Sequence, residues 1–224
     1  MISSVFSSLL KKDFRLLFGT REYLAASVLL SAGMFIFFRF MLAKGSIESQ
    51  FLVVPLVAAF QISALFLVFV TSSQDTFWKA GSISILSNID SSVVFLSHFM
   101  GMLCALFVLY IGSIFLWSIL ILPAGVSILN ESIIPVLLAG ITSCASLAAL
   151  GPLLSILSLH SRLGQLVLVI LYFPLGLPAV SGSAMVLREA LNGTFVYTQL
   201  GLSAAFALIY LAAGIFLYGY FRED

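Results

Sequence analysis

Charged residues are scarce in this chain of 224 amino acids: Asp, Glu, Lys and Arg together make up 8% of it. Soluble globular domains carry about 25% charged residues. Hydrophobic residues make up 62% of the sequence, which is more apolar surface than a soluble core of this length can bury. The composition therefore predicts an all-α integral membrane protein, formed as a single domain over residues 1–224, with lipid as the solvent for most of the chain.

Several motifs that bind nucleotides, metals or substrates are also missing. None of the four lysines follows a glycine, which excludes a phosphate-binding loop of the G-x-x-x-x-G-K-[ST] type. No cluster of His, Cys and carboxylates has metal-ligand spacing, and no G-x-S-x-G elbow presents a nucleophile. The formal net charge of +1 gives no reason to expect a nucleic-acid partner. We therefore expect no metal site, no catalytic site and no enzymatic activity in this chain.

The few cysteines and histidines permit more than one interpretation. Cys104 and Cys144 lie in apolar blocks, where a disulfide requires that their two spans touch and two buried thiols are the simpler interpretation. Histidine can ligate haem iron. However, His98 and His160 both fall at the expected membrane border, where an amphipathic ring is stable without a ligand. The sequence assigns no cofactor-binding residue.

Six apolar blocks are each long enough to cross a bilayer, which takes about 20 residues. We predict transmembrane helices at residues 23–42, 51–71, 97–122, 133–159, 163–187 and 199–220. Cytoplasmic flanks carry an excess of Lys and Arg. One set of flanks holds seven basic residues, and the opposite set holds Lys44 and Arg188. This asymmetry predicts that both termini lie in the cytoplasm.

Residues 2–18 are predicted to form an amphipathic helix at the membrane interface. Its apolar face carries Ile2, Val5, Phe6, Leu9, Leu10, Leu16 and Leu17, and its polar face carries Ser4, Ser8, Lys11, Lys12 and Arg15. Asp13 is an exception, because it falls on the apolar side. Such a helix suits the headgroup plane, with its basic face toward anionic lipid. The alternative is a frayed tail that only carries a topology signal.

The connection between the second and third spans is the only one long enough to hold a further element. Apolar residues line one side of a helix there: Trp78, Ile85, Leu86 and Ile89, with Ile83 nearby. Asp75 would accept hydrogen bonds from the first N–H groups of that helix, and Gly81 weakens it in isolation. We therefore predict a cytoplasmic helix at residues 75–90 that rests on the bilayer or on a partner. The expected interface residues are Asp75, Trp78, Lys79, Gly81, Ser82, Ile85 and Ile89.

Prolines interrupt two of the apolar blocks. Each proline removes a backbone hydrogen bond, and in lipid the freed carbonyl needs another partner. We expect conformational breaks at Gly151, Pro152, Pro174 and Pro178, which suit a bundle interior or a moving element, and a static kink is the alternative. Arg39 lies near the outer end of the first span. It either snorkels to the interface or contacts an anionic group of the outer leaflet.

These features together resemble the CcmB family, the membrane subunits of the haem-exporter-type ABC complex in bacterial cytochrome c maturation. The likeness runs from Leu10-Lys-Lys-Asp-Phe-Arg-Leu16 through Asp75, Gly81-Ser82 and Val93-Val94-Phe-Leu, and is best at Leu159-His-Ser-Arg-Leu-Gly164 and Pro174-Leu-Gly-Leu-Pro178. The chain also departs from the family pattern. It reads Gly81-Ser82-Ile83-Ser84 where the family usually has Gly-Ser/Thr-Leu-Glu, and Ser97-His98 replaces a basic residue near the start of the third span.

The resemblance implies an ABC-2-like permease half in the bacterial inner membrane, coupled to haem handling or to release of a haem chaperone at the outer face. It implies that ATP is bound by a separate CcmA-like ATPase, that CcmC-, CcmD- and CcmE-like proteins are partners, and that haem is a substrate of the complex. A homodimer or a multi-subunit complex is also implied. Two alternatives stay open: an ABC-2 permease that exports a lipid, drug or polysaccharide, and a membrane scaffold that transports nothing.

Overall fold

The computed structural model describes residues 2–19, 21–42, 49–77, 90–121, 133–159, 164–192 and 197–223. These residues form seven α-helices: α1 (Ile2–Gly19), α2 (Arg21–Leu42), α3 (Ser49–Phe77), α5 (Ser91–Leu120), α6 (Ile133–Leu159), α7 (Gly164–Leu191) and α8 (Tyr197–Glu223). All of them except α1 are long and apolar enough to cross a membrane, which gives six candidate spans. The expected class is confirmed at this level: the chain is an all-helical, multi-pass membrane protein.

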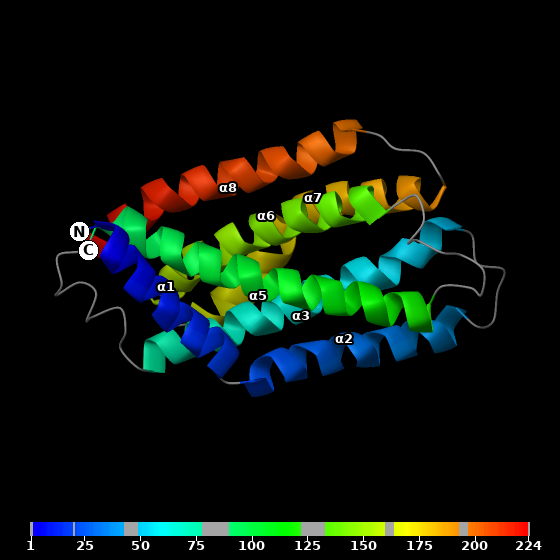
Figure 1. Cartoon of the computed structure of the whole chain (residues 1–224), viewed down its shortest axis with the longest axis horizontal. Helices are drawn as coiled ribbons and strands as arrows, with labels where there is room; N and C mark the ends of the chain where they lie inside the picture. Colours follow the sequence, from blue (N-terminus) through cyan, green and yellow to red (C-terminus); the bar gives the residue numbers. More distant parts are fainter. Residues whose placement is uncertain are drawn as a thin grey trace.

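The six long helices lie side by side in one bundle, and α1 lies at the end of the bundle where the chain both begins and ends (Figure 1). Helices α3 and α6 form the centre of the bundle. In their membrane spans, 61% and 56% of the residues are buried, respectively. By contrast, only 17% of the α2 span and 11% of the α8 span is buried. The first and last spans therefore leave most of their surface to lipid or to other proteins.

The interior contains two hydrophobic clusters. The larger one includes Phe60, Leu106 and Tyr172, and the second includes Phe35 and Trp117. In a membrane the lipid tails are as apolar as these side chains, so helix association depends on close packing and interhelical hydrogen bonds rather than on the hydrophobic effect. The faces that turn inward should therefore be marked by small and polar residues.

Buried serines mark those inward faces. Ser31 of α2 shares a hydrogen bond with Ser63 of α3, with 2.7 Å between the hydroxyl oxygens, and accepts one from Ser113 of α5 at 3.4 Å. Ser155 of α6 donates to Ser72 of α3 at 3.0 Å. Such bonds contribute about 0.6 kcal/mol each in a membrane protein. Their main effect is to specify which helix faces meet.

Two helix ends differ from the prediction. The second span was expected to stop at residue 71, but α3 continues to Phe77. Asp75 therefore lies in the last turn of α3 and not at the start of a separate helix, and the segment that it was predicted to cap lies outside the described residues. The third span was expected to start at residue 97, but α5 begins at Ser91 because Asp90 caps it, accepting a 3.0 Å hydrogen bond from the Ser92 N–H.

The proline-containing spans are continuous helices. Residues Gly151 and Pro152 lie inside α6, and Pro174 and Pro178 lie inside α7, which runs on to Leu191. Neither helix ends at these residues, so the expected breaks are not interruptions of helical structure. The role of these positions as a moving element stays a prediction.

Donors from neighbouring helices explain part of this continuity. The Tyr210 hydroxyl of α8 donates to the Leu175 carbonyl at 2.6 Å, in the turn that precedes Pro178. Pro178 lacks the N–H that would bond the adjacent Pro174 carbonyl, and its ring disturbs the carbonyls of this turn. In lipid, a neighbouring side chain can satisfy them. The proline turn of α7 is thereby fixed against α8.

Candidate functional site

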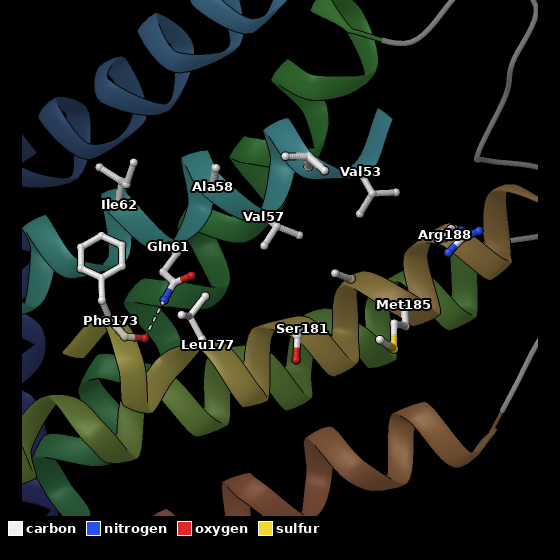
Figure 2. Close-up of a pocket in the computed structure, with 12 residues that line it drawn as sticks. Val53, Val57, Ala58, Gln61, Ile62, Phe173, Leu177, Ser181, Met185 and Arg188 are labelled. Carbon is white, nitrogen blue, oxygen red and sulfur yellow. Dashed lines mark hydrogen bonds between the residues drawn. The ribbon is translucent and has the colours of Figure 1, made fainter. Parts of the chain in front are cut away.

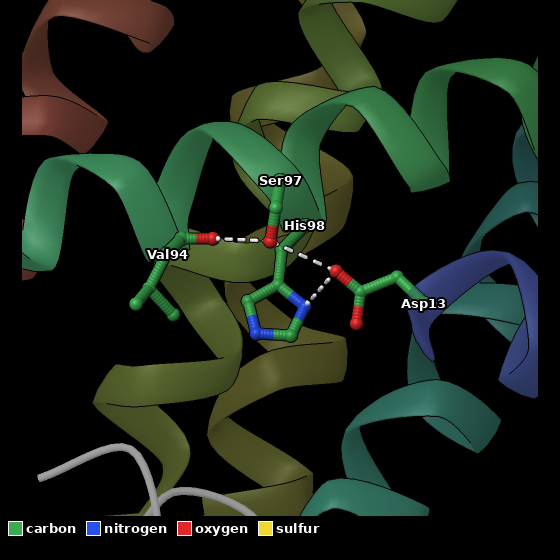
Figure 3. A network of polar contacts seen from close by, with 4 residues as sticks. All are labelled: Asp13, Val94, Ser97 and His98. Atoms are coloured by element: carbon green, nitrogen blue, oxygen red, sulfur yellow. Dashed lines mark hydrogen bonds and ion pairs between the residues drawn. The ribbon is translucent and has the colours of Figure 1, made fainter. Parts of the chain in front are cut away.

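A buried carboxylate joins α1 to α5. Asp13 is only 5% exposed, although Lys12 beside it is exposed. Figure 3 shows its side chain directed at α5. The Ser97 hydroxyl donates to Asp13 Oδ2 at 3.0 Å, and His98 Nδ1 lies 3.3 Å from the same oxygen. When the His98 imidazole is protonated, the second contact is an ion pair.

This contact accounts for the one residue that broke the amphipathic pattern of α1. A buried carboxylate is stable only when it is hydrogen-bonded or paired, so Asp13 fixes this face of α1 against α5 rather than against lipid. The basic residues Lys11, Lys12 and Arg15 are exposed. The structure has a helix over these residues, α1, and its predicted role as an amphipathic helix in the headgroup plane stays a prediction.

The two ends of the expected docking segment lie at the same end of the bundle as this contact. Figure 1 shows that α3 ends and α5 begins at the end of the bundle that holds α1. Six of the predicted interface residues lie outside the described residues: Trp78, Lys79, Gly81, Ser82, Ile85 and Ile89. The seventh, Asp75, lies in α3, but its side chain is not among those that the structure describes.

A groove of about 460 Å³ runs between α3 and α7 (Figure 2). Most of its lining is apolar: Val53, Val54, Val57, Ala58, Ile62, Phe173, Leu177, Ala184 and Met185. The polar lining residues are Gln61, Ser181 and Arg188. The volume is in the range of small-molecule sites in proteins, about 300–1,000 Å³. The groove is therefore large enough to hold part of a ligand.

The polar groups of the groove are well separated. Gln61 is 3% exposed, and its amide nitrogen donates to the Phe173 carbonyl at 3.4 Å, so it joins α3 to α7. Arg188 is exposed in the last turn of α7, at the other end of the groove in Figure 2. The sequence prediction counted Arg188 only as a topology signal and did not single out Gln61. The available signal was a lone amide in the middle of an apolar span.

The remaining candidate residues lie apart from the groove. Arg39 is exposed in the last turn of α2 and does not line the groove. Cys104 and Cys144 are both free thiols. Within the described ranges, no three His, Cys, Asp or Glu side chains come together as metal ligands.

In comparisons with protein-family models, curated proteins and solved structures, no match to this chain was found. The resemblance to the CcmB family therefore stays an expectation that the sequence motifs alone support.

Proposed function

We propose that this chain is the membrane permease subunit of an ABC-type complex required for cytochrome c maturation, in the bacterial inner membrane with both termini cytoplasmic. A separate CcmA-like subunit binds and hydrolyses ATP. The observation that carries the proposal is the convergence of three features at one end of the bundle. These are the end of α3, the start of α5, and α1, which is fixed to α5 through Asp13.

This convergence offers a mechanical route from the ATPase to the membrane. Residues 78–89 connect α3 to α5 directly, so a partner that moves this connection also moves the ends of both helices. Both helices contribute to the central cluster, with Phe60 and Leu67 on α3 and Phe99 and Leu106 on α5. Because α1 is attached near the start of α5, it would move with them. A permease without a nucleotide site needs a contact of this kind.

The family resemblance supports the more specific assignment. In this proposal the complex also contains CcmC-, CcmD- and CcmE-like proteins and uses ATP to handle haem or to release the loaded haem chaperone at the outer face. The chain takes part as a homodimer or within a larger assembly. We assign no catalytic residue and no haem ligand to it.

The α3–α7 groove favours one alternative. An ABC-2 exporter of a lipid or another amphiphile needs an apolar path along its spans, and the groove has a lining of that character. A scaffold that transports nothing needs neither the groove nor a coupled ATPase. Nucleotide-dependent distance changes between the spans would be expected for both permeases and not for a scaffold.

Deletion of the gene separates these functions. We expect membranes of the deletion strain to lose covalent haem on c-type cytochromes while the CcmE-like chaperone accumulates in its haem-loaded form. The wild-type gene on a plasmid should restore the cytochromes. Unchanged c-type cytochromes, in a strain with no second copy, would reject the maturation function and favour the general exporter.

A further inference from the structure

The groove between α3 and α7 is open along one side. Val54, Leu177 and Met185 line it and are 50%, 52% and 47% exposed. These residues belong to membrane-spanning helices, so their solvent is hydrocarbon. An acyl chain can therefore enter the groove laterally from the bilayer.

The length of the groove fits a lipid tail. Along α7 the lining extends from Phe173 to Arg188, which is about 22 Å at a rise of 1.5 Å per residue. The hydrocarbon core of a bilayer is about 30 Å thick. With Arg188 at the headgroup level, the groove therefore extends below the middle of the bilayer. At its deep end, the contact between Gln61 and the Phe173 carbonyl joins the two helices.

The charged residue at the end of the groove opposite Gln61 determines which lipid headgroup fits. Among the described residues, Arg188 is the only charged one that lines the groove, and no carboxylate lines it. Within the described part of the chain, Arg188 makes no ion pair. A guanidinium group binds phosphate through several charge-assisted hydrogen bonds. A zwitterionic headgroup would bring an ammonium group for which the lining offers no anion.

We propose that the α3–α7 groove is a binding site for an anionic phospholipid, with one acyl chain along the groove and the phosphate on Arg188. The site does not depend on the maturation function, because it follows from the groove and its charge alone. It distinguishes Arg188 from Arg39, which is also exposed in the last turn of a span but does not line this groove.

The test uses the full chain in nanodiscs that contain phosphatidylglycerol and phosphatidylcholine with the same acyl chains. Lipids that stay bound after transfer to detergent are counted by native mass spectrometry. We expect the wild type to retain phosphatidylglycerol in preference. Arg188→Gln should lower that preference by about tenfold, equivalent to about 1.4 kcal/mol. Arg39→Gln should leave it unchanged, and an equal loss in both variants would overturn the proposal.

Filling the groove provides the second arm. Ala184→Phe places a ring among the lining residues, and Ala205→Phe places one on the exposed face of α8. Ala184→Phe should remove the retained lipid, and Ala205→Phe should not. Lipid retained by Ala184→Phe, with the variant still monodisperse, would contradict binding in the groove.

Photolabelling of the wild type keeps the test independent of any variant. A phosphatidylglycerol with a photoreactive group in its acyl chain should label peptides that contain residues 53–62 and 173–185. Labelling confined to α8 would overturn the proposal.

A disulfide between two copies of the Met185→Cys variant in lipid would also overturn the proposal, because a second copy would then fill the groove. Displacement of the lipid by haem at equimolar concentration would reassign the groove to haem.

Discussion

The indole Nε1–H of Trp117 in α5 donates a 2.8 Å hydrogen bond to the Leu52 carbonyl of α3, in the turn that precedes Pro55. Trp117 is fully buried. Pro55 has no N–H for the neighbouring Phe51 carbonyl, and its ring disturbs the backbone of this turn, so the indole adds a hydrogen bond to a stretch of helix that the proline weakens. A bulky side chain of one span thus supports the backbone of another.

Trp117→Phe should destabilise the bundle by about 1–3 kcal/mol, because it leaves a buried carbonyl without this donor. The midpoint of unfolding in mixed micelles measures the loss. The matched background is Pro55→Ala, in which the turn can form its own hydrogen bonds. In the Pro55→Ala background, Trp117→Phe should lower the free energy of unfolding by at least about 0.5 kcal/mol less than it does in the wild type. Equal costs in both backgrounds would mean that the indole matters only for packing.

Asp13→Ala should release α1 from the bundle, because Ser97 and His98 lose their common acceptor. We expect backbone amides of residues 6–15 to exchange with deuterium about tenfold faster or more in nanodiscs, which corresponds to about 1.4 kcal/mol. Asp13→Asn keeps an acceptor for Ser97 without the charge, so its effect should be intermediate. Lys12→Ala, on the exposed side of the same helix, is the control and should exchange as the wild type does. Unchanged exchange in Asp13→Ala would show that α1 is held by other contacts.

Two buried tyrosines should respond in opposite ways to loss of the hydroxyl. Tyr110 donates to the Val136 carbonyl at 3.0 Å, whereas the Tyr172 hydroxyl has no hydrogen-bond partner within the described residues. Tyr110→Phe leaves a buried carbonyl without this donor and should cost about 1–3 kcal/mol of stability. Tyr172→Phe should be neutral or stabilising, because it removes a polar atom that is buried without compensation. Thermal unfolding in one detergent compares the two, and a larger loss in Tyr172→Phe would contradict the assignment.

Replacing Pro174 and Pro178 together by Ala should leave assembly with the ATPase intact but uncouple ATP hydrolysis from cytochrome maturation. The physical reason is that regular hydrogen bonding stiffens α7 through the turn that Tyr210 now supports. Copurification, ATPase rate and haem staining measure the three properties in the same preparation. Normal maturation in the double variant would favour the static kink.

The docking segment can be tested by single substitutions to Asp at Trp78, Ile85 and Ile89. Each places a charge on the apolar side of the predicted helix, so we expect loss of copurifying ATPase while the protein still inserts in the membrane. Ser84→Asp, on the polar side, is the control and should retain the ATPase. Retention in all three apolar-side variants would reject the segment as the docking element.

The six spans could be predicted from the sequence because length and apolar composition alone select them. Contacts between spans could not be predicted in this way. Asp13 stood out as a polar residue on an apolar face, but its partner Ser97 lies 84 positions along the chain, and no periodicity identifies such a pair. The groove was not predictable either, because it depends on how α3 and α7 separate beyond Gln61.

The misplaced start of α5 had a signal that the prediction did not use. The apolar run begins only at Val93, and hydropathy therefore favoured a later start. Asp90 followed by two serines is a capping pattern, because a short acidic side chain accepts from the first free N–H groups of a helix. Similarly, the prolines suggested interruptions, and the donors that preserve the helices come from residues such as Tyr210 that only the folded bundle brings near.

The contact between Gln61 and the Phe173 carbonyl spans 112 positions of the chain. At a synthesis rate of about 5–20 residues per second, α7 emerges roughly 6–22 s after Gln61 does. During that interval the amide has entered the membrane without the carbonyl that it finally bonds. The nascent chain must therefore hold a polar group of α3 in water or against another helix until the fifth span arrives. This delay gives the order of insertion a direct influence on how α3 and α7 come together.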